Sequence, residues 1–344
     1  MQPGAYTAII TPLINNSVDY DGLDTLIEFQ IKNGITGIVA VGTTGESPTL
    51  TWDEHNKIIE ETAKKTRSRC LCIAGTGSNN TDETLSATLH AVHAGADGVL
   101  LVDPYYNGPS SLEIRKEYIE PIAREYPMIQ IIPYVVPART GTQLLPEDLA
   151  ILAETFENVR TVKEATGNLD NMRRTRKCCG SQYTILSGDD GVTFEMMSDP
   201  EIKAAGVISV ISNIAPKAVS KMVELLNRGN VNEAKKLSAS LAPLFEIVTV
   251  KTQEKTAYGE VMCRARNPLP VKTMMQILGM PSGACRQPMG KMTKNGIEKV
   301  ISALRKVQSN NPEILEPITG HFNVDIKQRI NNPKNWENLS YSAY

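Results

Sequence analysis

Gly37-Ile-Val-Ala-Val-Gly-Thr-Thr-Gly-Glu-Ser47 decides the fold, because it joins a short apolar run to a glycine-rich turn. An amphipathic stretch follows at Thr51–Thr66, and a second apolar run follows at Cys70–Gly75. Thr51 and Glu54 stand at the start of the amphipathic stretch with the spacing of a helix capping box. A buried strand, a helix and another buried strand in this order are typical of a parallel sheet covered by helices.

The same alternation continues from residue 5 to about residue 228. Helical stretches such as Asp21–Asn33 and Asn80–Ala94 separate the apolar runs. Eight βα units are the number that closes a (β/α)₈ barrel, a domain of about 250 residues. The predicted strands are Ala5–Thr11, Gly37–Val41, Cys70–Gly75, Gly98–Val102, Ile129–Tyr134, Val159–Lys163, Tyr183–Ser187 and Gly206–Ile211.

An open, doubly wound sheet is the alternative arrangement of βα units. Such a sheet normally carries a G-x-G-x-x-G turn after its first strand. Here the first strand runs into Thr11-Pro-Leu13, and Gly75-Thr-Gly77 is only a fragment of that motif. We therefore predict a closed barrel over residues 1–228.

The sequence pattern changes after Arg228. Residues 229–308 are expected to form a small helical region, and residues 309–344 a polar, asparagine-rich extension. In the extension, Trp336, Tyr341 and Tyr344 indicate docking on a surface, for which a neighbouring subunit is one candidate. The helical region is expected to contain no strands, only the helices Val231–Val250, Pro270–Leu278 and Gly290–Gln308.

The composition excludes several classes of protein. With 41% hydrophobic and 22% charged residues, the chain has the profile of a soluble globular protein. A formal net charge of −2 gives no general attraction to nucleic acid or to anionic membranes. No apolar run approaches the roughly 20 residues of a membrane helix, and the N-terminus lacks the order of a secretory signal. We expect a cytoplasmic protein.

A metal site is not expected. The six cysteines include no C-x-x-C pair, so they do not have the spacing of a zinc site. His90 and His93 could share one face of a helix, but the sequence offers them neither an acidic partner nor a third histidine nearby.

Polar side chains follow several of the predicted strands, where a barrel of this kind places its active site. They supply hydroxyls, phenols, a guanidinium group and an amine at one rim. The stretches are Gly42–Ser47, Pro104–Pro109 with its two tyrosines, Tyr134 with Arg139, Lys163, and Ser187–Asp190.

Lys163 is the most informative of these residues. Burial at the end of a strand lowers the pKa of a lysine, and a neutral amine attacks ketones and aldehydes. On its position alone, a surface lysine at a strand edge is the favoured interpretation of Lys163. Arg139, however, can hold a carboxylate in bidentate geometry, and the hydroxyls and phenols can carry protons. The set predicts a Schiff-base enzyme that acts on carboxylated substrates.

These motifs resemble a known family. Over about residues 3–300 the chain is similar to the dihydrodipicolinate synthase family, and more broadly to the pyruvate-dependent class I aldolases related to N-acetylneuraminate lyase. The residues that carry the resemblance, in order along the chain, are Gly42-Thr-Thr-Gly-Glu-Ser47, Tyr105-Tyr-Asn107, Tyr134 with Arg139-Thr-Gly141, Lys163-Glu-Ala-Thr-Gly-Asn168 and Gly188-Asp-Asp190.

The resemblance implies a reaction without a cofactor. Lys163 would form a Schiff base with pyruvate, and its enamine would attack L-aspartate-4-semialdehyde to give 4-hydroxy-tetrahydrodipicolinate. Tyr134 and Thr43 would relay protons, together with Tyr106 from a neighbouring subunit. Substrate would be held by Thr44, Arg139, Gly188 and the backbone around Ile208.

The resemblance also implies an assembly and a second site. The borrowed Tyr106 requires at least a dimer, and a tetramer built as a dimer of dimers is expected. Family members that lysine inhibits bind it at the cleft between paired barrels. The matching positions here are Ser47, Trp52, His55, Asn79, Glu83 and Tyr105.

Two other functions stay open at this point. A sister aldolase that acts on 2-keto-3-deoxy sugar acids, or an N-acetylneuraminate lyase-like enzyme, would share Lys163 and Tyr134. A barrel that has lost catalysis and serves as a binding protein is disfavoured by the full set of reactive residues. One departure from the family pattern is Val135, where the family usually has asparagine, so the hydrogen bonding near Tyr134 is expected to differ.

Overall fold

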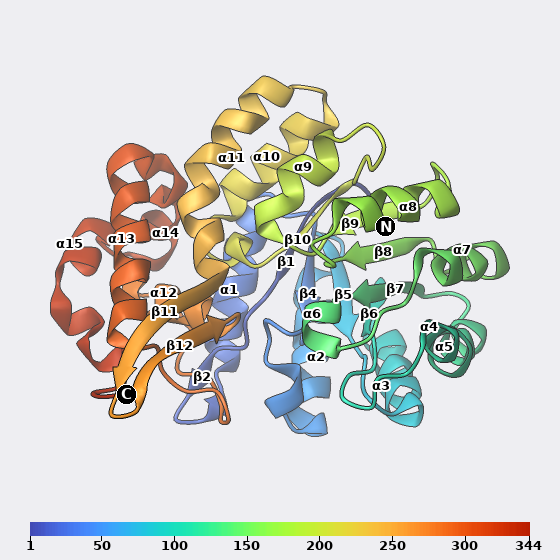
Figure 1. The fold of residues 1–344 in the computed structure, drawn as a ribbon, viewed down its shortest axis with the longest axis horizontal. Helices are drawn as coiled ribbons and strands as arrows, with labels where there is room; N and C mark the ends of the chain where they lie inside the picture. Colours follow the sequence, from blue (N-terminus) through green and yellow to red (C-terminus); the bar gives the residue numbers. More distant parts are fainter.

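The protein is a closed barrel of eight parallel strands with a helical region at one side. The computed structural model describes residues 1–344. Its strands follow the order β1-β10-β9-β8-β7-β6-β5-β4, and pairing of β1 with β4 closes the ring. Figure 1 shows the strands at the centre, with α1 to α10 around them and α12 to α15 to one side. The predicted barrel is confirmed, and the open sheet is excluded.

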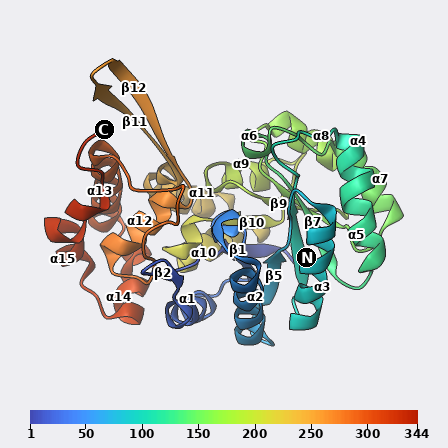
Figure 2. The same cartoon turned by 90° about the horizontal axis from the view of Figure 1, so that it is seen from below.

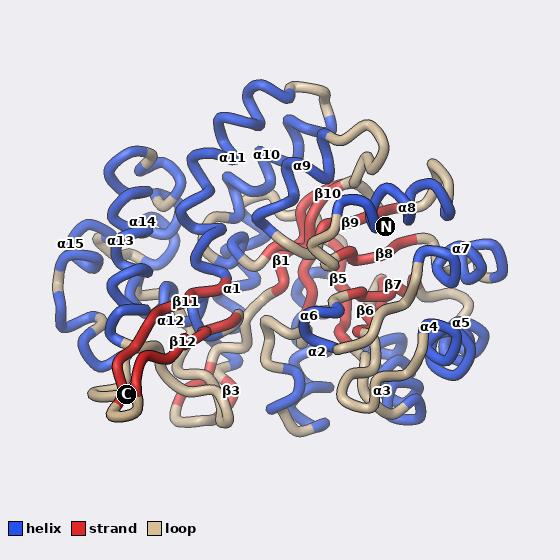
Figure 3. Tube along the Cα trace, viewed as in Figure 1, coloured by secondary structure: helices blue, strands red, loops and turns tan.

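Each barrel strand overlaps one of the predicted strands. Valine, isoleucine, leucine and alanine dominate them, as expected for strands that are covered on both faces. Figure 3 shows these strands in red inside a layer of helices in blue. Their bounds are β1 Gly4–Ala8, β4 Gly37–Ala40, β5 Leu71–Gly75, β6 Gly98–Val102, β7 Gln130–Val135, β8 Thr161–Glu164, β9 Thr184–Ser187 and β10 Gly206–Ser209.

The helices around the barrel begin where the sequence offers caps. Thr51 accepts from the backbone of Glu54 and the Glu54 side chain accepts in return, which confirms the capping box. The three barrel helices predicted with bounds, now α1, α2 and α3, agree to within one residue at each end. The surrounding helices are α1 Tyr20–Lys32, α2 Trp52–Thr66, α3 Thr81–Ala94, α4 Ser111–Glu113, α5 Glu120–Glu125, α6 Pro137–Thr140, α7 Pro146–Thr155, α8 Leu169–Cys179, α9 Thr193–Ser198 and α10 Pro216–Asn227.

The region after the barrel contains a β-hairpin, so the prediction of helices alone was wrong. The helix predicted to reach Val250 ends at Phe245, and β11 and β12 follow it as an antiparallel pair. Buried Val250 and Thr252 alternate with exposed Lys251 and Gln253, the period of two that a strand requires. Figure 2 shows the hairpin projecting from the body of the protein. The elements are α11 Val231–Phe245, β11 Thr249–Thr256, β12 Gly259–Arg266, α12 Leu269–Leu278 and α13 Lys294–Asn310.

The C-terminal extension packs on its own chain. It forms α14 Glu316–Phe322 and α15 Ile326–Asn331, which bury Ile318 and Ile330. The Arg329 side chain donates to the carbonyl oxygen of Ile277 at 2.7 Å, which ties α15 to α12. A neighbouring subunit is therefore not required to hold it. Of the three aromatic residues expected to dock, Trp336 packs against the core, whereas Tyr341 and Tyr344 are 51% and 68% exposed.

Side chains of each strand alternate between the inside of the barrel and the layer under the helices. On β7, Tyr134 belongs to the cluster inside the barrel, and Val135 belongs to the larger cluster between barrel and helices. The side chain of Val135 therefore points away from that of Tyr134. The expectation that Val135 changes the hydrogen bonding at Tyr134 was wrong for this geometric reason.

Two carboxylates lie beside Val135 in the same outer layer. Val135 pairs in register with Glu164 of β8, and Asp103 follows the residue of β6 that pairs with Tyr134. Both acids are fully buried. Burial raises the pKa of Asp103 to about 8, with a hydrogen bond from the Leu144 backbone opposing and Glu164 reinforcing the rise. Burial also raises the pKa of Glu164, although it accepts hydrogen bonds from Thr166 and Asn171.

No helix of the structure combines the length and the apolar character that crossing a bilayer requires.

Replacing Asp103 with asparagine should stabilise the protein at neutral and alkaline pH. The folded protein keeps a proton that the unfolded chain releases, so wild-type stability falls as pH rises from about 4 to about 8 and is level above. Asp103→Asn removes this loss, so its gain in stability should vanish near pH 4 and grow by about 1.4 kcal/mol per pH unit up to about pH 8.

Urea unfolding at several pH values measures this difference. Glu157→Gln, which makes the same change from acid to amide at an exposed loop position, should leave the pH dependence as in the wild type. A gain that is the same at every pH would contradict the titration of Asp103.

Candidate active site at the mouth of the barrel

Lys163 points into the mouth of the barrel from the end of β8. It is 5% exposed, and its Nζ lies 4.0 Å from the centre of the Tyr134 ring, on the neighbouring strand. Burial lowers the pKa of Lys163 to about 7; the positive charge of Arg139 lowers it further, and Asp190 opposes the shift. A substantial fraction of the amine is therefore neutral and nucleophilic at neutral pH.

Tyr134 and Thr43 stand together next to this amine. Tyr134 ends the inward-facing row of β7, and Thr43 belongs to the turn that follows β4. Burial raises the pKa of Tyr134, whereas nearby Arg139 and a hydrogen bond with Thr43 lower it. A phenol in contact with a hydroxyl and an amine can pass protons between them.

A cavity of about 210 Å³ opens at this mouth. It lies at the carboxyl ends of the strands, where barrels of this kind bind their substrates. Its lining includes three predicted catalytic or binding residues, Thr43, Tyr134 and Arg139. Lys163 is not part of this lining, but its amine lies against the ring of Tyr134, which is.

Gly188 and Ile208 occupy the side of the mouth nearest Lys163. A Cβ at Gly188 would lie 2.7 Å from the Cβ of Ala165 and 3.2 Å from the Cε of Lys163. Only glycine leaves this approach open. Ile208 is buried in the inner layer on β10. Gly188 thus borders the space next to the Lys163 side chain.

Asp190 lies next to the site. The sequence motif Gly188-Asp-Asp190 contained it, but no role was predicted for it. Its carboxylate accepts from Ser209 and from the backbone nitrogen atoms of Val210, at 2.9 Å, and Ile211, at 3.1 Å. Burial raises the pKa of Asp190 to about 6, and these hydrogen bonds oppose the rise. It fixes the end of β10 and acts on the charge of Lys163 from a distance.

Arg139 and Thr44 meet a residue that sequence reasoning missed. Arg139, on α6, donates from Nη2 to the carbonyl oxygen of Asn267 at 3.2 Å. Thr44 is buried and accepts a hydrogen bond from Asn267 Nδ2 at 2.9 Å. Asn267 is 223 residues from Thr44 in the sequence. Only the adjacent Asn-Pro pair marked it as a turn, so no local signal connected it with the barrel.

Tyr106 does not join the cavity within one chain. Its side chain is 94% exposed, and its backbone adopts a φ of 79°. A left-handed conformation in a large residue is costly and is usually held by its surroundings. The structure thus leaves the Tyr106 phenol free to reach another molecule.

The six residues predicted for a lysine site follow β4, β5 and β6. Ser47 and Tyr105 line the same cavity as Thr43, and Asn79 accepts from the backbone nitrogen of Tyr105 at 2.7 Å. Trp52 and His55 are in edge contact, with ring centres 4.9 Å apart. Burial lowers the pKa of His55 to about 4, so this ring is neutral at neutral pH. The sixth residue, Glu83, accepts from Ser78 Oγ.

His90 has an acidic neighbour that the sequence did not suggest. Glu60, on α2, lies 3.2 Å from His90 Nε2. No three histidine, cysteine or acidic side chains converge as metal ligands in the structure.

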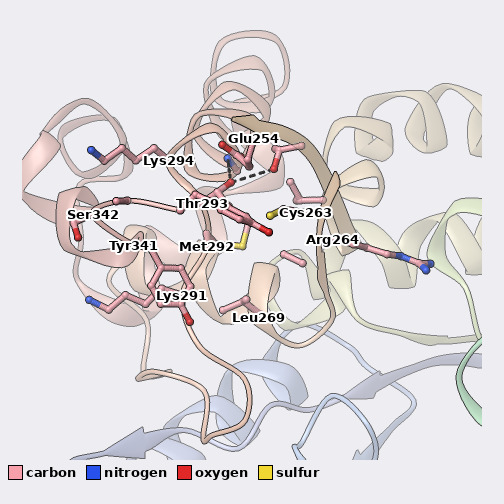
Figure 4. A pocket seen from close by; sticks show the side chains of 16 residues that line it. Glu254, Cys263, Arg264, Leu269, Lys291, Met292, Thr293, Lys294, Tyr341 and Ser342 are labelled. Atoms are coloured by element: carbon pink, nitrogen blue, oxygen red, sulfur yellow. Dashed lines mark hydrogen bonds between the residues drawn. The ribbon is translucent and has the colours of Figure 1, made fainter. Parts of the chain in front are cut away.

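A larger hollow of about 440 Å³ lies far from Lys163, between the hairpin, α13 and the last residues of the chain (Figure 4). Some of its polar groups are paired with one another or with backbone. The hydroxyls of Thr252 and Thr293 lie 3.1 Å apart, and Lys291 donates to the Asn338 carbonyl oxygen at 2.9 Å. It contains none of the predicted catalytic residues, so the smaller cavity is the candidate active site.

Comparison with known proteins shows the family of the chain. Residues 1–307 match the dihydrodipicolinate synthetase family. A 4-hydroxy-tetrahydrodipicolinate synthase of Methanococcus maripaludis is 41% identical over 304 residues, which are 88% of this chain and 98% of the relative.

Two solved structures are similar over most of the chain. A dihydrodipicolinate synthase of Acinetobacter baumannii complexed with pyruvate has 33% identity and a TM-score of 0.77, covering 89% of this chain and 99% of that one. One of Cyanidioschyzon merolae with lysine bound has 32% identity and a TM-score of 0.80, covering 89% and 98%. The chain belongs to the dihydrodipicolinate synthetase family.

Proposed function

We propose that the protein condenses pyruvate with L-aspartate-4-semialdehyde to give 4-hydroxy-tetrahydrodipicolinate, the lyase-class step of diaminopimelate and lysine biosynthesis. The observation that carries this proposal is the buried Lys163, whose pKa lies at about 7 at the mouth of the barrel. Relatives that carry the name of this synthase support it.

The chemistry needs no cofactor. The neutral Lys163 amine adds to the ketone carbon of pyruvate, and water leaves to give an iminium ion. The iminium withdraws electrons, so a methyl proton leaves and an enamine forms. The enamine carbon attacks the aldehyde of the second substrate. The amino group of that substrate then attacks the former ketone carbon, which closes the ring and releases Lys163.

Protons move through Tyr134 and Thr43 in this proposal. Their contact next to Lys163 supports the role, because both groups can donate and accept. Tyr106 completes the relay in a neighbouring subunit, in line with its exposed phenol. The assembly is then at least a dimer, and we propose a tetramer built as a dimer of dimers, located in the cytoplasm.

The substrate carboxylates are held by separate groups. Thr44, Gly188 and the backbone at Ile208 surround the pyruvate attached to Lys163, and Arg139 at the rim holds the carboxylate of the semialdehyde. The same Arg139 favours this short substrate over the sugar acids of the sister aldolases. The names of the relatives support the same choice.

Lysine is proposed as a feedback inhibitor that binds at Ser47, Trp52, His55, Asn79, Glu83 and Tyr105. Two observations support this. A similar structure from Cyanidioschyzon merolae has lysine bound. Ser47 and Tyr105 line the cavity that also contains Thr43, which gives the second site a direct route to the first.

Replacing Lys163 with alanine should abolish the covalent adduct with pyruvate. Borohydride reduces the iminium ion, so wild-type protein treated with pyruvate should gain the mass of one reduced adduct, on Lys163. Lys163→Ala should gain none and lose at least about a thousandfold in turnover while remaining folded. Lys57→Ala, a change at a lysine outside the site, should trap like wild type, and an adduct mapped to any other lysine would sink the proposal.

The pH dependence of adduct formation should move when Arg139 is removed. In the wild type the rate should rise as pH increases through about 7, because the neutral amine is the nucleophile. Arg139→Met removes a positive charge that lowers the Lys163 pKa, so the midpoint should shift to higher pH. Trapping with pyruvate alone measures this without the second substrate. Arg228→Met, at the exposed end of α10, is the control, and an unchanged midpoint in Arg139→Met would count against the coupling.

Lysine at millimolar concentration should lower the steady-state rate. Glu83→Gln should weaken this inhibition about tenfold, because a neutral amide attracts the lysine ammonium group less than a carboxylate does. Its rate without lysine should stay near that of the wild type. Rates that stay flat up to millimolar lysine in the wild type would rule out feedback by this route.

A further inference from the structure

Asn267 lies over the mouth of the barrel, between the end of β12 and the start of α12. It is 6% exposed. Its side chain donates from Nδ2 to Thr44 Oγ1 at 2.9 Å, and its backbone carbonyl oxygen accepts from Arg139 Nη2 at 3.2 Å. One residue of the C-terminal region thus contacts both groups assigned to the two substrate carboxylates.

The segment that carries Asn267 is fixed to the turn that carries Thr44. Lys272 donates from Nζ to Glu46 Oε1 and to the carbonyl oxygens of Thr11 and Ala284, the last two at 3.0 Å. Lys272 and Glu46 are 0% and 1% exposed. A buried ion pair contributes little net stability, but breaking it is costly, so it holds its two segments in one arrangement.

A further contact ties the same segment to the Arg139 side of the mouth. Arg266, the residue before Asn267, donates from Nη2 to the Ala138 carbonyl oxygen at 3.2 Å. The Asn267 amide therefore has little freedom to move relative to Thr44.

The direction of the Asn267–Thr44 hydrogen bond has a chemical consequence. A threonine hydroxyl has one proton to donate and lone pairs that accept. The one hydrogen bond that the Thr44 hydroxyl makes in the structure is the bond it accepts from Asn267. Its own proton is therefore free for another acceptor, and a carboxylate needs such a donor to bind.

We infer that Asn267 is a positioning residue that fixes the Thr44 hydroxyl as a hydrogen-bond donor toward the carboxylate of pyruvate. This inference rests on the proposed function, in which Thr44 holds pyruvate. Asn267 acts through Thr44 and does not itself touch the reacting atoms.

Asn267→Asp tests the direction of the bond. A carboxylate only accepts, so Thr44 would donate its proton to the introduced carboxylate and lose it for the substrate. The KM for pyruvate should rise on the order of 100-fold, with a smaller change in kcat. Asn267→Ala leaves the hydroxyl free but unoriented and introduces no charge, so the KM should rise about tenfold. Asn230→Asp, the same change at an exposed position before α11, should have no effect.

A double-mutant cycle tests the route of the effect. In a Thr44→Val background, Asn267→Ala should cause no further rise in KM, because the hydroxyl it orients is gone. Thermal unfolding of each variant checks that the fold is intact. The side-chain changes leave the carbonyl oxygen that Arg139 uses in place.

The outcomes separate this inference from the proposed function. If wild-type protein is not trapped by borohydride with pyruvate, the proposed function fails. If the wild type is trapped and Asn267→Asp has an unchanged KM for pyruvate, the Thr44 hydroxyl is not held as a donor and the inference is wrong. Fully additive effects of Thr44→Val and Asn267→Ala would equally overturn it, since Asn267 would then act by another route.

Discussion

The chemistry of this protein depends on one buried amine that has no carboxylate in contact with it. Lys163 and Lys272 are both buried, yet their partners differ. Lys272 meets Glu46 and two carbonyl oxygens, so its charge is compensated and it serves as an anchor. Lys163 meets the face of the Tyr134 ring and lies near the positive charge of Arg139, which leaves its pKa at about 7. Burial alone does not make a nucleophile. The charges around the buried amine decide whether it reacts or only holds the structure.

The C-terminal region takes part in the site and is more than an appendage to the barrel. Its segment from Arg266 to Lys272 contacts the turns after β4 and β7, which carry Thr44 and Arg139. The hairpin determines where this segment begins, and the extension packs behind α12 through Arg329. A boundary at residue 228 matches the end of α10, the last helix of the barrel, but the mouth of the barrel is completed from beyond it. The C-terminal region therefore helps to determine the shape of the substrate site in the barrel.

The sequence was sufficient for the barrel and for the groups around Lys163, because both follow from local patterns. A strand with period two and a turn of known position place Thr43, Tyr134 and Lys163 at one rim without any knowledge of distant contacts. Asn267 could not be found in this way, since its only link to the site is a contact across more than 200 residues. The hairpin was missed because its strands are half exposed and polar, with threonine, lysine and glutamate where apolar residues usually mark a strand. The effect of Val135 on Tyr134 was misjudged because the two residues are adjacent in the sequence, yet their side chains point to opposite faces of the strand.

The alternation of strand side chains also explains how an acid can directly follow the reactive lysine in the sequence without neutralising it. Glu164 directly follows Lys163 on β8, and Asp103 directly follows Val102, the last residue of β6. Both carboxylates point outward, under the helices. There they accept hydrogen bonds from backbone and amide groups: Leu144 for Asp103, and Thr166 and Asn171 for Glu164. If either carboxylate pointed inward, an ion pair with Lys163 would raise the pKa of the amine. The amine would then stay protonated at neutral pH and could not act as a nucleophile. The barrel wall thus separates the reactive side chains inside it from the acidic side chains outside it. Burial of those acids lowers the stability of the fold but does not affect the nucleophile.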